Sequence, residues 1–140
     1  MRGRRPTELK AIEGGLSGRA ALPADVPKVM RSEWDRIVSD LASRKLLTPA
    51  TLGTVAAYLI ARWQVAECVK AIQQDGAFVR TKQGEPKPHP AHGVMNKANE
   101  IVARLAAELG LTPAARSRRG LAGPAEGGEA NDGAPAGLDL

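Results

Sequence analysis

The chain has 140 residues and a net charge of +5, and 43% of its residues are hydrophobic but only 3% aromatic, so we expect one domain with tails around a thin core. Its single cysteine, Cys68, excludes an intramolecular disulfide and a cysteine-rich zinc site. No apolar run approaches the ~20 residues needed to cross a bilayer, and no apolar segment follows the basic N-terminus as in a secretory signal, so we expect a cytoplasmic protein.

The first 23 residues are rich in Gly and Arg and lack sustained helical periodicity, so we interpret residues 1–23 as a flexible basic arm. Its cationic side chains are Arg2, Arg4, Arg5, Lys10 and Arg19. Such an arm can follow DNA phosphates or enter a narrow minor groove. Composition alone supports a solvated tail equally well.

Two helices are predicted in the first half of the body. The first runs from about Asp25 to Lys45, where apolar residues recur at steps of three and four. The second begins at Pro49, after Thr48 as N-cap, and runs to about Asp75. Both are longer than the usual helices of a helix-turn-helix, and the second is too apolar to lie in a major groove. We therefore expect an αα-hairpin that serves assembly.

Apolar side chains cover more than one side of this second helix. In so short a chain, we expect the second apolar side to pack against another subunit. The side chains predicted to make this oligomer contact are Leu52, Val55, Leu59, Trp63 and Val69.

The segment after the second helix favours extended structure over residues 77–82, and residues 83–84 can reverse the chain. Pro86 and Pro88 exclude a regular central strand on the return. The segment is therefore predicted to be either an edge β-hairpin or a loop.

A third helix is predicted from about Pro90 to a stop at Gly110, and Thr112 and Pro113 then begin a short fourth helix. The third helix has Val94, Ala98, Ile101, Leu105 and Leu109 on its predicted apolar face. The short helix leads into a cationic cluster made of Arg116, Arg118 and Arg119. Beyond it the chain is rich in Gly, Ala, Pro and acidic residues, so residues 120–140 are predicted to form a disordered acidic tail.

Motifs of enzymes and metal sites are weak in this sequence. No glycine-rich phosphate loop is present. His89 and His92 have a spacing that metal ligands can use, but nearby acidic residues at a matching step are missing, so structural histidines are favoured. Cys68 is interpreted as a packing residue, and Trp34 and Trp63 as core anchors rather than a stacking platform.

Two segments at opposite ends of the body carry a family resemblance. One is Leu109-Gly110-Leu111-Thr112-Pro113-Ala114-Ala115-Arg116-Ser117-Arg118. The other is Arg2-Gly3-Arg4-Arg5-Pro6-Thr7, followed by Leu9-Lys10, Glu13-Gly14 and Gly18-Arg19. Together they resemble the phage terminase small subunits, which select viral DNA for packaging. Many members of that family carry a distinct helix-turn-helix domain, and this sequence departs from that pattern.

The resemblance implies an all-α subunit that assembles into a closed homo-oligomeric ring in the host cytoplasm. It implies binding to double-stranded viral concatemer DNA and recruitment or regulation of the large terminase subunit. The large subunit supplies ATP hydrolysis and DNA cleavage in that family, so we expect no catalytic residue, cofactor or metal here. A DNA-binding transcriptional regulator and a structural phage adaptor are the alternatives.

The predicted organisation has three parts. These are a flexible basic arm (1–23), a helical oligomerisation and DNA-binding domain (24–119) and a disordered acidic tail (120–140). The residues assigned to nucleic-acid contact are Arg2, Arg4, Arg5, Lys10, Arg19, Arg116, Arg118 and Arg119.

Overall fold

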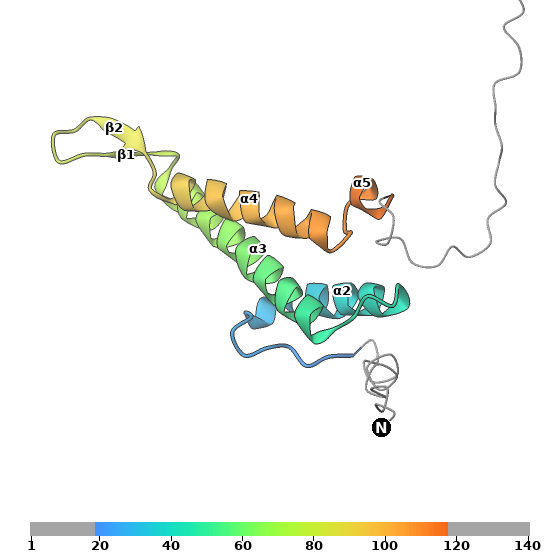
Figure 1. Ribbon diagram of the computed structural model, residues 1–140. Helices are drawn as coiled ribbons and strands as arrows, with labels where there is room; N and C mark the ends of the chain where they lie inside the picture. Colours follow the sequence, from blue (N-terminus) through green and yellow to red (C-terminus); the bar gives the residue numbers. More distant parts are fainter. Residues whose placement is uncertain (1–18, 118–140) are drawn as a thin grey trace, which may run out of the picture.

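The computed structural model describes residues 19–117, which are mostly helical (Figure 1). In chain order the elements are a 3₁₀ turn η1 (Lys28–Met30), α2 (Arg31–Ser43), α3 (Pro49–Asp75), β1 (Phe78–Arg80), β2 (Pro86–Pro88), α4 (Ala91–Glu108) and α5 (Pro113–Arg116). The long α3 runs antiparallel to α4, and α2 packs near the beginning of α3 (Figure 1). The predicted helical fold with a small hairpin is confirmed, and the most extensive helix pair is α3 with α4 rather than α2 with α3.

The long helix α3 begins and ends where local hydrogen bonding predicts. The Thr48 hydroxyl accepts a hydrogen bond from the backbone N–H of Thr51 at 3.2 Å, and the Thr51 hydroxyl accepts one from the N–H of Thr48 at 2.7 Å. This reciprocal capping box satisfies N–H groups that have no partner within the helix. At the other end Gly76 has φ +90°, which a residue with a side chain rarely adopts.

The hydrophobic core lies where α2, the first half of α3 and the last turns of α4 meet. Its most completely buried large side chains are Trp34, Val38, Leu41, Val55 and Leu59. The Trp34 indole N–H donates to the carbonyl of Ala20 at 2.8 Å, and Ala20 and Leu22 pack against the core. The last residues of the segment predicted as the arm are therefore held against the helices.

The apolar face predicted for α4 is partly wrong. Ala98, Leu105 and Leu109 are buried as expected, but Val94 and Ile101 are exposed. An apolar stripe is wider than a single helix contact, and α3 covers only one edge of it. Partly buried Val102 and buried Ala106 complete the packed side instead.

The segment between α3 and α4 is an antiparallel β-hairpin. Of the two predicted alternatives, a hairpin or a loop, the hairpin is therefore confirmed. Phe78 pairs with Pro88, Val79 with Lys87 and Arg80 with Pro86. The hairpin extends beyond the ends of the two long helices (Figure 1). With only two short strands it has unpaired edges on both sides, where proline is tolerated.

Candidate nucleic-acid interface

The residues predicted to contact DNA are divided between described and undescribed parts of the chain. Arg19 is exposed at the start of the described range, and Arg116 lies in α5. The others lie outside the described residues, namely Arg2, Arg4, Arg5, Lys10, Arg118 and Arg119.

Arg116 is positioned by a tight reversal between α4 and α5. Gly110 has φ +64°, and the N–H of Leu111 donates to the carbonyl of Ala106 at 2.9 Å, which closes the end of α4 in a Schellman motif. The Thr112 hydroxyl then accepts a hydrogen bond from the N–H of Ala115 at 3.2 Å and caps α5. This local geometry brings Arg116 back toward α2.

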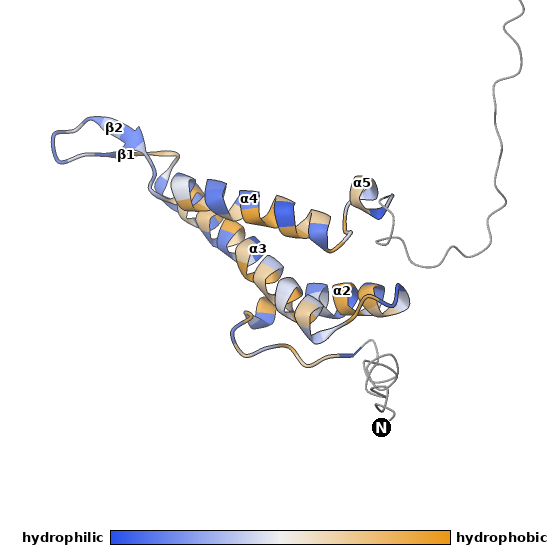
Figure 2. Ribbon diagram, viewed as in Figure 1, coloured by the Kyte–Doolittle hydropathy of each residue, from blue (hydrophilic) through white to orange (hydrophobic). Residues whose placement is uncertain are grey.

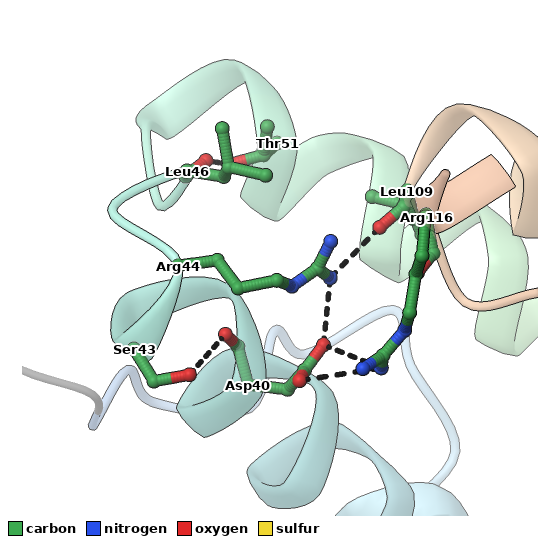
Figure 3. A network of polar contacts seen from close by, with 8 residues as sticks. Asp40, Ser43, Arg44, Leu46, Thr51, Leu109 and Arg116 are labelled. Carbon is green, nitrogen blue, oxygen red and sulfur yellow. Dashed lines mark hydrogen bonds and ion pairs between the residues drawn. The ribbon is translucent and has the colours of Figure 1, made fainter. Parts of the chain in front are cut away.

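Asp40 in α2 is the acceptor shared by two arginines (Figure 3). Arg116 donates through Nη2 to both carboxylate oxygens at 3.3 Å, while its Nε donates to the carbonyl of Gly110 at 3.0 Å. Arg44 Nη2 donates to Asp40 Oδ2 at 2.6 Å and to the carbonyl of Leu109 at 2.9 Å. These bonds join α2 to the ends of α4 and α5.

A cleft of about 410 Å³ opens beside this network. It lies among α2, α3, α5 and the residue that follows the α4 reversal, and we call it the arginine cleft. Its lining residues are Arg36, Ile37, Asp40, Tyr58, Arg62, Leu111 and Arg116. Guanidinium groups from three separate helices therefore surround a surface that is partly aromatic and aliphatic.

Positive charge is in excess around the arginine cleft. Glu33 forms ion pairs with Arg36 and Arg62. Asp40 forms them with Arg44 and Arg116. Each carboxylate is thus shared by two guanidinium groups. The side chains of the three lining arginines are 73% (Arg36), 43% (Arg62) and 49% (Arg116) exposed, so they remain accessible from solvent.

Sequence reasoning missed Arg36 and Arg62 as members of this cluster. Neither belongs to a charge run, and they lie on different helices. Their shared partner Glu33 becomes visible only when α2 and α3 are packed together. The spacing of Glu33 and Arg36, three residues apart, gave a weak signal of a helical ion pair, but no signal for Arg62.

The β-hairpin carries a second basic group. Its cationic side chains are Arg80, Lys82 and Lys87, and all are exposed. The Arg80 Nη1 donates to the carbonyl of Gly84 at 2.8 Å, which leaves this guanidinium fixed across the turn. Figure 2 shows that the second strand and the turn are hydrophilic.

The two histidines fix the base of the hairpin. His89 Nδ1 accepts a hydrogen bond from the N–H of Ala91 at 3.0 Å, and its Nε2 lies 3.1 Å from a carboxylate oxygen of Asp75. His92 Nε2 lies 3.1 Å from the carbonyl of Ala77. These contacts support the structural interpretation. Within residues 19–117, no group of three or more His, Cys, Asp or Glu side chains is placed to hold a metal ion.

The residues predicted to mediate oligomerisation occupy different environments. Val55 and Leu59 are completely buried by other parts of the same chain, and Leu52 packs partly buried against that core. Trp63 is half-buried, while Val69 is exposed. Because α3 packs against both α2 and α4, its two apolar sides do not by themselves require a second subunit. The oligomer contact stays a prediction.

Residues 31–126 match the family described as phage terminase, small subunit. The chain belongs to this family. Its role is therefore in phage DNA packaging. Members of this family are generally non-catalytic regulatory subunits. Searches of curated proteins and of solved structures found no match.

The matched range of the terminase small subunit family contains every helix described from α2 to α5 and all the residues that line the arginine cleft. It also includes Arg118 and Arg119, which lie outside the described residues. None of the helices in the described part of the chain is both long and apolar enough to cross a membrane.

Proposed function

We propose that this terminase small subunit binds double-stranded viral concatemer DNA and recruits and regulates the large terminase subunit during packaging. The family match over residues 31–126 carries the proposal. The net charge of +5 favours a polyanionic partner. In this proposal the chain acts in the host cytoplasm without catalysing a reaction itself.

DNA contact is assigned to basic residues near the two ends of the sequence. The N-terminal group contains Arg2, Arg4, Arg5, Lys10 and Arg19, and the C-terminal group contains Arg116, Arg118 and Arg119. Arg19 directly precedes Ala20, which together with Leu22 packs against the core. The N-terminal segment therefore joins the folded body at this position. Contacts with phosphates raise affinity for any DNA sequence, whereas sequence preference requires contacts with bases.

Assembly into a closed ring is the second part of the proposal. Exposed apolar side chains on a small body favour association with further copies of the chain. On α4, Val94 and Ile101 are seven residues apart and share a face, and on α3 Val69 is exposed. These three side chains are free of the core and are better placed to meet a neighbouring subunit than Val55 and Leu59.

The proposed function is tested with the full chain and its large subunit. Light scattering gives the oligomeric state, and a DNA-binding titration gives the affinity. The ATPase rate of the large subunit is then measured with DNA, with and without the chain. We expect a closed ring that binds DNA and changes this rate.

A dimer that binds a palindromic site and has no effect on the large subunit would instead indicate a transcriptional regulator. A chain that neither binds the large subunit nor changes its ATPase rate would indicate a structural adaptor. Both outcomes contradict the proposal.

A further inference from the structure

The arginine cleft has the chemistry of an anion-binding site. Its three accessible cations are all arginines, whose planar N–H groups match phosphate oxygens in paired hydrogen bonds. They come from α2, α3 and α5, which are held together by the buried core and by the Asp40 network. The helices that carry these arginines are therefore placed before any ligand arrives.

The lining arginines keep hydrogen-bond donors outside their known ion pairs. Arg36 uses Nη2 toward Glu33, and Arg62 uses Nη1 toward the same carboxylate oxygen. Arg116 uses Nε and Nη2 in its contacts with Gly110 and Asp40. The other N–H groups of each guanidinium take no part in these bonds, and a guanidinium has five in total. A phosphate can thus bind through these N–H groups while the Asp40 ion pairs that join α2 to α5 stay in place.

We propose that the arginine cleft binds a backbone phosphate of double-stranded DNA through Arg36, Arg62 and Arg116. This inference rests on the proposed DNA-binding function and assigns part of it to the folded body. Asp40 opposes the phosphate little, because Arg44, which does not line the cleft, neutralises it. Glu33 is the main internal competitor, since it occupies Arg36 and Arg62. The cleft would orient the body on the duplex without reading its sequence.

The proposed phosphate contact predicts that substitutions at Arg36 and Glu33 change the DNA affinity in opposite directions. Replacing Arg36 with Gln removes one cation whose side chain is largely exposed, so the fold should be retained. Replacing Glu33 with Gln removes the carboxylate that competes with phosphate for Arg36 and Arg62. The first change should weaken DNA binding, and the second should strengthen it.

The test is fluorescence anisotropy with the full chain and a short duplex DNA over a salt series. Arg36→Gln should make the slope of log affinity against log salt shallower by about 0.9 for each phosphate that is no longer neutralised. Arg104→Gln is the matched control, because Arg104 is exposed on α4 and does not line the cleft. Glu33→Gln is compared with Glu100→Gln, which changes the net charge equally on the exposed surface of α4.

We expect a shallower salt slope with Arg36→Gln but not with Arg104→Gln. We expect Glu33→Gln to raise the DNA affinity more than Glu100→Gln does. Thermal unfolding of each variant verifies that the fold is intact. If wild-type protein binds DNA and the cleft variants behave like their controls, the cleft assignment is overturned while the DNA-binding function stands. If wild-type protein binds no DNA, the function itself fails, and the cleft assignment fails with it.

Discussion

Arg44 joins the end of α2 to the end of α4 by donating a hydrogen bond from Nη2 to the carbonyl oxygen of Leu109 at 2.9 Å. The same nitrogen bonds Asp40 at 2.6 Å, and the Arg44 side chain is only 8% exposed. A buried cation therefore satisfies both a carboxylate and a helix-terminal carbonyl. This contact fixes one wall of the arginine cleft, because Asp40 in turn holds Arg116 (Figure 3).

Replacing Arg44 with Ala is expected to lower the free energy of unfolding by about 1.5–3 kcal/mol, as for removal of a hydrogen bond to a charged group. The Leu109 carbonyl would be deprived of this donor inside the protein. Urea denaturation measures the change. Arg116→Ala is the control, because its ion pair with the same Asp40 is about half exposed and should contribute only about 0–1 kcal/mol. Equal losses of stability in the two variants would contradict the role given to Arg44.

Replacing Lys45 with Gly is expected to stabilise the fold by about 1 kcal/mol. Lys45 has φ +57°, a left-handed conformation that costs a residue with a Cβ roughly this amount. The reversal it makes is supported by the N–H of Leu46, which donates to the carbonyl of Leu41 at 2.9 Å. Thermal or urea unfolding measures the gain. Lys45→Ala removes the same charge but keeps the Cβ, so a similar gain in that variant would show that backbone strain is not the cause.

Core packing and assembly should respond to different substitutions. Leu59→Ala is expected to lower the free energy of unfolding by about 2–5 kcal/mol, because this side chain is completely buried within one chain. Replacing both Val94 and Ile101 with Ser should leave each subunit folded but weaken the oligomer, since both are exposed. Circular dichroism and light scattering distinguish the two effects. An oligomer unchanged by the double substitution would rule out this face of α4 as the contact.

Removal of the basic arm is expected to weaken DNA binding. The deletion should cover residues 1–18, because Ala20 accepts the Trp34 hydrogen bond and Leu22 packs on the core. The slope of log affinity against log salt should become shallower by about 0.9 for each phosphate that the arm neutralises in the intact protein. A salt titration measures this slope. An unchanged affinity and slope would mean that the arm is a solvated tail.

Removal of residues 121–140 tests how negative charge affects DNA binding. This segment contains Glu126, Glu129, Asp132 and Asp139. Without these carboxylates, DNA affinity should stay equal or rise, while stimulation of the large subunit should fall. The same salt titration and an ATPase assay of the large subunit measure the two effects. A clear decrease in DNA affinity would contradict this assignment.

Local patterns in the sequence predicted most of the helix ends, although α2 begins at Arg31 rather than near Asp25. Thr48 and Pro49 start α3, Gly76 ends it, and Gly110 ends α4. These ends depend on hydrogen bonds between residues at most a few positions apart and on the conformational freedom of glycine. The same local chemistry predicted the reversal that precedes Arg116.

Only the tertiary structure decided which side chains meet. Val94 and Ile101 fit the apolar stripe of α4, yet its packing against α3 leaves them exposed. Arg36, Arg62 and Arg116 are far apart in the sequence and become neighbours around one cleft. The reason is physical: a helix end depends on a few consecutive residues, whereas the position of a side chain against another helix depends on how the two helices cross.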